Sequence, residues 1–341
     1  MSFSTAYDAL LFDLDGTVWL EGRALDFAVD AINNAQIPVA YITNNASRGP
    51  EAVAAMLGEM GVPTTADQVL TSAQAAIGLA EEVLSPGDGV YVVGAESFKQ
   101  LVREAGYLVA ETADEQPKAV LHGHNPETGW AQLSEAALAI QQGAKYMASN
   151  LDATLPTPRG FCVGNGSLVA AVTNATGVVP QSAGKPGPAM FHQAAQRFGA
   201  SKPLAVGDRL DTDIAGGVAA GYDTLHVLTG VSKHWALLRA AAGERPTFVA
   251  ESLACLDQEP ALFAPGPQGG FQATAQDGNI VLSGGGSATN GGAGAVGLEG
   301  EKPATHALRT ALQVAWASQS PFEGELIAEG PAAQAAVAAW V

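Results

Sequence analysis

The sequence has few cysteines and no long apolar run, and each scarcity excludes a class of protein. Only Cys162 and Cys255 occur among 341 residues. They match no zinc-ligand spacing or redox pair, and they exclude a disulfide framework, so we expect two buried structural thiols. No apolar run approaches the roughly 20 residues of a membrane span, and no basic stretch precedes an apolar segment near residue 1. These absences predict a soluble, cytoplasmic protein.

Basic side chains are also scarce, with 16 Lys and Arg against 34 Asp and Glu and a formal net charge of -18. Such a field repels a phosphate backbone, so we expect no nucleic-acid partner. An anionic substrate would need local compensation from a metal ion or a well-placed lysine. Hydrophobic residues make up 47% of the chain, which provides a core and excludes disorder over most of its length.

Apolar runs alternate with segments of helical spacing, which is typical of a doubly wound α/β fold with a parallel sheet. The expected strands lie at 9–12, 37–42, 90–93, 119–122, 146–148, 203–206, 224–228 and 248–250. The expected helices lie at 26–35, 49–60, 97–104, 130–142, 306–318 and 331–341. Ligands of such sheets bind outside the carboxyl ends of the strands, where polar clusters follow the first two runs.

The pattern predicts a core at 1–84 and 180–262, a smaller inserted α/β unit at 85–179 and a C-terminal appendage at 263–341. The appendage opens on a Pro-Gly-Pro linker signal and holds a glycine-rich stretch at 283–300, which predicts a flexible or tightly turning loop. No lysine follows that stretch at P-loop spacing, so it is no phosphate cradle. We expect the appendage to serve packing or self-association, the latter as a homodimer.

Asp13 and Asp15 stand two residues apart where the first expected strand opens into its loop, and Gly16 lets the backbone approach a ligand. Two carboxylates here could share a divalent ion, or one could attack while the other handles a proton. By itself such a pair is usually a capped turn, so further polar groups have to decide between the two interpretations.

Further polar groups follow other expected strands. They are Thr43, Asn44, Lys185, Asp208 and Asp213. Together with the first pair they provide a nucleophile, an acid, a hydroxyl, a cation and metal-binding carboxylates, which is what phosphoryl transfer requires. Four such features in order at strand ends of one sheet favour a functional interpretation over turn chemistry.

These residues resemble the four motifs of the haloacid dehalogenase-like superfamily. The matching segments are Asp13-Leu14-Asp15-Gly16-Thr17, Thr43-Asn44-Asn45, Lys185 and Gly207-Asp208-Arg209-x-x-Thr212-Asp213. The insert resembles the type-2 cap of phosphatases acting on 4-nitrophenyl phosphate, phosphoglycolate and glycerol phosphate. Its matching segments are Asn150-x-Asp152-x-x-x-Pro156, Gly164-x-Gly166-Ser167, Ala175-Thr176-Gly177 and Gly184-Lys185-Pro186. The resemblance covers residues 9–262, and bacterial glycerol-3-phosphate phosphatases share a similar extra C-terminal segment.

The resemblance implies a role for each matching residue. Asp13 would be the nucleophile that forms an aspartyl-phosphate, and Asp15 would protonate the leaving oxygen and then activate water. Thr43 and Asn44 would bind phosphoryl oxygens, and Lys185 would pair with Asp13 and the phosphoryl group.

The implied cofactor is Mg²⁺, held by Asp13, the main-chain carbonyl of Asp15 and Asp208, which are the hard oxygen ligands that it prefers. Asp213 would orient Lys185 or metal-bound water, and Asp211 would face solvent. Because dehalogenases do not need the acid at Asp15, its presence favours hydrolysis of phosphate esters.

The implied activity is that of a Mg²⁺-dependent phosphatase of small phosphorylated metabolites, with glycerol 3-phosphate as the expected substrate. The alternatives are 2-phosphoglycolate and a broad activity on sugar phosphates or 4-nitrophenyl phosphate. A cap loop with Asp152, Thr154 and Leu155 would test the leaving group. A catalytically silent phosphometabolite-binding protein is the non-enzyme alternative, against which the intact Asp13 and Asp15 pair argues.

Four further residues could have either a structural or a functional role. His122 and His124 end an expected strand without an evident third metal ligand, which favours a hydrogen-bonded or surface role over metal binding. Arg209 could serve an ion pair or the substrate, and Arg159 is expected to face solvent.

Overall fold

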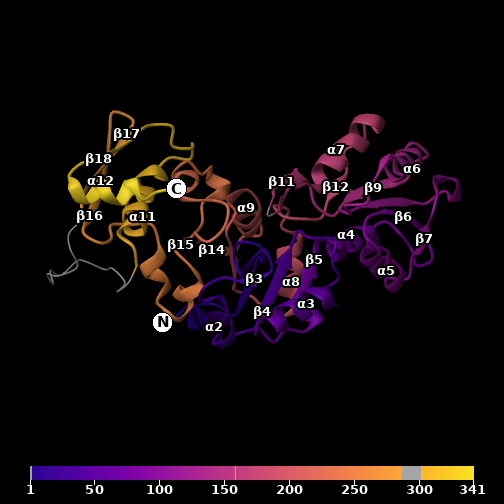
Figure 1. Ribbon diagram of the computed structural model, residues 1–341, viewed down its shortest axis with the longest axis horizontal. Helices are drawn as coiled ribbons and strands as arrows, with labels where there is room; N and C mark the ends of the chain where they lie inside the picture. The colour runs from indigo at the N-terminus through magenta and orange to yellow at the C-terminus, as the bar shows by residue number, and fades with distance from the viewer. Residues whose placement is uncertain (1, 158, 286–300) are drawn as a thin grey trace. The chain divides into compact units, whose positions relative to one another are not determined.

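The computed structural model describes residues 2–157, 159–285 and 301–341, and the chain forms two compact units. The first unit comprises Met1–Val39 and Ala195–Val341, and the second comprises Ala40–Ala194. Within the described ranges, no helix has the length and apolar character that crossing a membrane requires. Parallel sheets flanked by helices occur in both units, which confirms the predicted fold class (Figure 1). The domain limits proposed from the sequence stay predictions.

The sheet of the first unit contains four parallel strands in the order β15-β14-β13-β1. Their bounds are β1 Ala9–Phe12, β13 Pro203–Gly207, β14 Asp223–Val227 and β15 Phe248–Ala250. Almost every residue of these strands is buried, as expected of parallel strands covered on both faces. The other strands and α-helices of this unit before residue 263 are α1 Phe3–Ala6, β2 Trp19–Leu20, β3 Arg23–Ala24, α2 Ala28–Asn33, α9 Ala215–Ala219 and α10 His234–Leu238.

The C-terminal segment, residues 263–341, belongs to the first unit and forms a small sheet covered by two helices (Figure 1). Its elements are β16 Phe271–Gln276, β17 Asn279–Gly284, α11 Pro303–Ala315, β18 Leu326–Ala328 and α12 Pro331–Ala338. The hairpin of β16 and β17 turns at Asp277 and Gly278, whose φ angles of 50° and 80° suit a type I′ turn. β18 pairs with β17 in parallel.

The second unit contains a five-stranded parallel sheet in the order β12-β9-β8-β6-β7, and β4 pairs with β5. The strands are β4 Val39–Thr43, β5 Val69–Thr71, β6 Gly89–Val93, β7 Leu108–Ala110, β8 Ala119–His122, β9 Lys145–Ala148 and β12 Gln181–Ser182. The helices are α3 Pro50–Glu59, α4 Ser72–Glu81, α5 Glu96–Glu104, α6 Trp130–Gln141, α7 Asn165–Thr176 and α8 Ala189–Arg197. An antiparallel hairpin joins β10 Thr154–Thr157 to β11 Gly160–Val163. β4 and α8 cross the boundary between the units.

The structure confirms the expected strands and helices, with ends that shift by a few residues. The predicted helices 306–318 and 331–341 correspond to α11 and α12, and α11 begins at Pro303, a residue suited to the first helical turn. The glycine-rich stretch was expected to form a loop from residue 283. Ser283 and Gly284 instead complete β17, and residues 286–300 lie outside the described ranges.

The prediction for Cys162 was wrong, whereas that for Cys255 is confirmed. Cys162 is exposed because it lies on β11, a strand of a two-stranded hairpin whose four residues are all exposed. Cys255 is buried, and its burial raises the pKa of the thiol and keeps it protonated.

Candidate active site

A cluster of three carboxylates lies at the carboxyl ends of two adjacent strands of the first unit. Asp13 follows β1 and Asp208 follows β13, and the main-chain N–H of Asp13 donates to the Val206 carbonyl over 2.8 Å. One oxygen each from Asp13, Asp208 and Asp213 lies within 4.8 Å of the others. Asp208 and Asp213 are buried and Asp13 is half-buried.

The Asp208 side chain is fully buried and held from two sides. Thr17 Oγ1 donates to its Oδ1 over 3.3 Å, and the Val231 N–H donates to its Oδ2 over 2.5 Å. Glycines leave room for it, because a Cβ at Gly16 would lie 2.7 Å from Asp208 Oδ2 and one at Gly230 only 1.8 Å. Gly16 also has a φ of 90°, which side chains disfavour.

Asp213 lies on a π-helical turn, Leu210–Ile214, which begins two residues after Asp208. Its Oδ2 accepts hydrogen bonds from the main-chain N–H groups of Asp208 (3.2 Å) and Arg209 (3.0 Å). This arrangement fixes the backbone that carries Asp208. Asp211 on the same turn is exposed, as expected, and pairs with Arg209, so the ion-pair interpretation of Arg209 is supported.

The cluster fits a hard divalent cation. Up to three negative charges lie together, two of them buried, and burial weakens the screening of their mutual repulsion unless a cation offsets it. Carboxylate oxygens that are few and rigidly held are the ligands that Mg²⁺ takes in phosphate sites.

Asp15 projects from the same loop as Asp13 but is exposed. Its Oδ1 accepts a hydrogen bond from the indole Nε1 of Trp19 over 2.8 Å, and the Gly16 N–H donates to the Trp19 carbonyl over 2.7 Å. Trp19 is buried at the start of β2, so it fixes one oxygen of Asp15. Sequence reasoning missed Trp19, whose only signal was a tryptophan four residues beyond Asp15.

Thr43, Asn44 and Lys185 gather at the end of β4 in the second unit. Asn44 pairs with the Lys185 main chain, accepting from its N–H on Oδ1 (2.9 Å) and donating through Nδ2 to its carbonyl (3.1 Å). Lys185 is buried, and its Nζ donates to the Ile42 carbonyl over 3.1 Å. Thr43 Oγ1 accepts from the Asn45 N–H over 3.1 Å.

The predicted cap loop is bonded to the same asparagine. Asn44 Nδ2 lies 3.3 and 3.2 Å from the two Asp152 oxygens. Asn150 Nδ2 donates to the Asn44 carbonyl (2.7 Å), and Asn165 Nδ2 donates to the Asn150 carbonyl (2.8 Å). Sequence reasoning assigned no role to Asn150 or Asn165, although Asn150 lies in a quoted motif. Thr154 and Leu155 lie on β10 and are exposed.

The two histidines form hydrogen bonds, and neither belongs to a cluster of metal-ligating groups among the described residues. His122 is buried with Nδ1 2.9 Å from the Tyr146 hydroxyl, and burial lowers its pKa to about 4, so the ring is neutral. His124 lies beside Ser47, with Nδ1 3.3 Å from its Oγ. Arg159 is exposed, as expected.

Two family models match the chain. One, described as haloacid dehalogenase-like hydrolase, matches residues 10–108, and a HAD-hydrolase-like model matches residues 182–256. D-glycerol 3-phosphate phosphatase of Mycobacterium tuberculosis is 43% identical over 281 residues, covering 82% of this chain and 80% of that protein. An acid sugar phosphatase of Staphylococcus saprophyticus is 38% identical, covering 66% of this chain and 88% of that protein.

A solved structure matches the chain over its whole length. It is the crystal structure of glycerol phosphate phosphatase Rv1692 from M. tuberculosis in complex with magnesium, at 38% identity and a TM-score of 0.90. The match covers 100% of this chain and 98% of that one, so the fold of the C-terminal segment has a counterpart there.

Proposed function

Because the chain belongs to the haloacid dehalogenase-like hydrolases, we propose that it is a Mg²⁺-dependent phosphatase that hydrolyses glycerol 3-phosphate. The observation that carries this proposal is the carboxylate cluster of Asp13, Asp208 and Asp213, with the acid Asp15 two residues beyond Asp13. A relative named for D-glycerol 3-phosphate and a magnesium complex of glycerol phosphate phosphatase support the choice of substrate and metal.

Asp13 and Asp15 divide the covalent chemistry between them. The Asp13 carboxylate attacks phosphorus and forms a P–O bond while the bond to the glycerol oxygen breaks, and Asp15 gives that oxygen its proton. In the second step Asp15 accepts a proton from water as the water oxygen attacks phosphorus. The aspartyl-phosphate bond then breaks, which restores the Asp13 carboxylate and releases inorganic phosphate.

Asp13, the Asp15 carbonyl and Asp208 would hold Mg²⁺, which when bound supplies positive charge against the phosphoryl oxygens. Asp213 steadies the Asp208 backbone through its two accepted hydrogen bonds, in keeping with an orienting role.

Thr43, Asn44 and Lys185 are the proposed phosphoryl ligands. The Asn44 amide already bonds to Lys185 and Asp152, so we assign phosphoryl binding to the Asn44 main-chain N–H and the Thr43 hydroxyl. Lys185 supplies a positive charge for an anionic substrate in a chain whose net charge is -18.

The activity test is a substrate panel with Mg²⁺, with release of inorganic phosphate as the readout. We expect the largest kcat/KM for glycerol 3-phosphate, turnover of 4-nitrophenyl phosphate, and loss of both with EDTA. Sugar phosphates form the second candidate class, which the acid sugar phosphatase relative favours, and 2-phosphoglycolate completes the panel. If no ester releases phosphate, the catalytically silent binding protein is the correct alternative.

Trp19→Phe should slow glycerol 3-phosphate hydrolysis about 10-fold, because phenylalanine keeps the packing but cannot hold the Asp15 oxygen in place for proton transfer. Turnover of 4-nitrophenyl phosphate should fall less, since its leaving group needs little protonation. The measurement is kcat on both substrates, with Trp130→Phe at an exposed position as the matched control. Equal losses on both substrates would contradict a role through Asp15.

Leu155→Ala should change the order of kcat/KM across the panel and leave 4-nitrophenyl phosphate turnover near wild type. Leu155 is exposed on β10 and is available to a leaving group, whereas Asp152 is bonded to Asn44. Asp152→Ala should therefore lower turnover of every ester, because it frees the Asn44 amide. An unchanged order of substrates in Leu155→Ala would remove this loop from the specificity element.

We propose a cytoplasmic localisation, which agrees with the phosphorylated substrates and with the two free thiols. Self-association as a homodimer stays a prediction, and sedimentation equilibrium of the full chain tests it.

A further inference from the structure

Residues 229–233 form a loop that contacts both strand ends of the carboxylate cluster. The Val231 N–H bonds to Asp208 Oδ2 (2.5 Å), and the Ser232 N–H donates to the Asp208 carbonyl (3.1 Å). Thr229 Oγ1 donates to the Gly16 carbonyl over 2.6 Å. The 229–233 loop therefore sets the position of Asp208 and of the loop that carries Asp13.

The 229–233 loop continues directly into α10, and α10 is embedded in the core of the C-terminal segment. Leu237 and Leu238 are fully buried in one apolar cluster with Leu308 and Leu312 of α11. The Trp316 indole also donates to the Leu237 carbonyl over 3.0 Å. The same cluster contains residues of the turn that bears Asp213, namely Leu210 and Ile214.

Trp340 connects this core to the start of α10. Its ring stacks on His234 with a centroid distance of 5.7 Å and an angle of 16°, and meets the edge of Trp235 at 5.2 Å. Its Nε1 donates to the Ala304 carbonyl of α11 over 3.1 Å. Because His234 directly follows the 229–233 loop, its stacking on Trp340 restricts the position of the C-terminal end of that loop.

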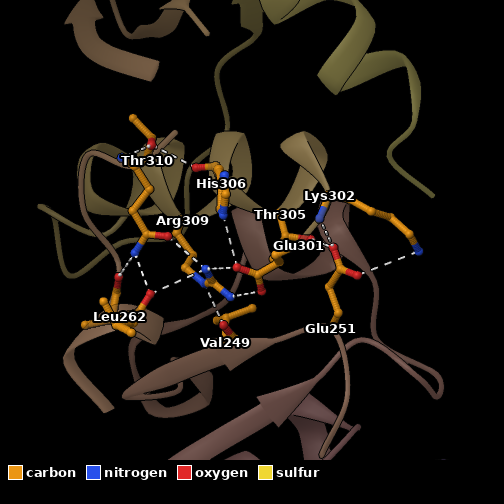
Figure 2. A network of polar contacts seen from close by, with 11 residues as sticks. Val249, Glu251, Leu262, Glu301, Lys302, Thr305, His306, Arg309 and Thr310 are labelled. Atoms are coloured by element: carbon orange, nitrogen blue, oxygen red, sulfur yellow. Dashed lines mark hydrogen bonds and ion pairs between the residues drawn. The ribbon is translucent and has the colours of Figure 1, made fainter. Parts of the chain in front are cut away.

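A buried arginine fixes the C-terminal segment to the four-stranded sheet of the first unit. Arg309 donates to the Val249 carbonyl of β15 (2.6 Å), to Gln268 Oε1 (2.8 Å) and to both Glu301 oxygens. Figure 2 shows the Arg309 side chain between Val249 and Glu301. Burial alone would raise the pKa of Glu301, but hydrogen bonds from His306 and Arg309 outweigh it and lower the pKa. The ion pair is therefore charged, and it holds α11 in one position against β15.

We propose that the C-terminal segment positions the metal-binding carboxylates, with Trp340 as a positioning residue that acts through His234 and the 229–233 loop on Asp208. The proposal rests on the proposed function in one respect, that the ion bound by the cluster is Mg²⁺. It gives the segment a role in the site although it contributes none of the motif residues.

The test measures Mg²⁺ binding to the full chain by isothermal titration calorimetry. Trp340→Leu should raise the Mg²⁺ Kd roughly 10-fold, as loss of a group that supports a metal ligand does. Trp340→Phe keeps a ring against His234 and should restore a Kd near wild type. Phe271→Leu, at a buried aromatic of the same core beside Gly285, is the matched control and should leave the Kd unchanged.

Hydrogen–deuterium exchange of residues 229–233 gives a readout that needs no metal. The Val231 and Ser232 amides should exchange at least about 10-fold faster in Trp340→Leu than in Phe271→Leu. If Trp340→Leu and Phe271→Leu had the same Mg²⁺ Kd and the same exchange rates at Val231 and Ser232, the proposal would be overturned. Any change relative to the wild type would then reflect general destabilisation of the C-terminal segment. If the wild-type chain bound no Mg²⁺, the proposed function would be overturned instead. The exchange rates at Val231 and Ser232 would then decide by themselves whether Trp340 positions the 229–233 loop.

Discussion

Asp13→Asn is expected to abolish phosphate release from glycerol 3-phosphate while the protein stays folded. The amide is nearly isosteric with the carboxylate, but it cannot attack phosphorus or serve as an anionic metal ligand. A loss of at least about 10³-fold in kcat follows from removal of a nucleophile. Folding should not suffer, because the substitution removes one of three mutually repelling charges. The measurements are steady-state phosphate release at saturating Mg²⁺ and the urea-unfolding midpoint.

Asp211→Asn is the matched control for this experiment. Asp211 lies on the turn that carries Asp213, but it is exposed and pairs with Arg209. Its kcat should stay near wild type. Turnover near wild type in Asp13→Asn, or an equal loss in the two variants, would remove Asp13 from the role of nucleophile.

The strands around the cluster could be predicted because they are buried on both faces. β1 and β15 have the predicted bounds, since each is a short apolar run that ends where polar residues begin. The position of Asp13 and Asp208 at neighbouring strand ends follows from that pattern and from the parallel pairing of β1 with β13.

Elements with exposed faces were harder to predict. The hairpin of β16 and β17 was missed although Asp277-Gly278 is a strong turn signal, because β16 is largely exposed and lacks a continuous apolar run. The sequence predicts a buried Cys162 because a free cysteine outside a metal or redox site is usually buried, yet Cys162 and its neighbours Phe161 and Val163 are exposed on β11. Apolar sequence indicates burial only where another layer covers the strand.

The contacts that complete the site join residues far apart in sequence. Asn44 bonds to Asp152 and to Lys185, and Val231 bonds to Asp208, through loops whose closure no local pattern encodes. The sequence indicated which chemical groups would be present. It could not indicate that the Asn44 amide is occupied by Lys185 and Asp152.

Gly230→Ala should weaken Mg²⁺ binding and destabilise the first unit. The added Cβ would lie 1.8 Å from Asp208 Oδ2 and 2.2 Å from its Cγ, which no real contact allows. Asp208 is fully buried and accepts hydrogen bonds from Thr17 and Val231, so its displacement would break these bonds. Displacing it should raise the Mg²⁺ Kd by roughly 10- to 100-fold. The overpacking should lower the free energy of unfolding by about 1–3 kcal/mol.

Gly243→Ala provides the matched control, because a Cβ at Gly243 would meet nothing within 4 Å and its φ is not in the left-handed region. Its Mg²⁺ Kd should equal that of the wild type, and its stability should be unchanged or higher by about 0.4–1 kcal/mol, since alanine reduces the freedom of the unfolded chain. Calorimetric titration with Mg²⁺ and urea unfolding of both variants test this. If Gly230→Ala lost stability but bound Mg²⁺ like Gly243→Ala, Asp208 would not be a ligand of the ion. The cation would then have to be assigned to Asp13 and Asp213, the other carboxylates of the cluster.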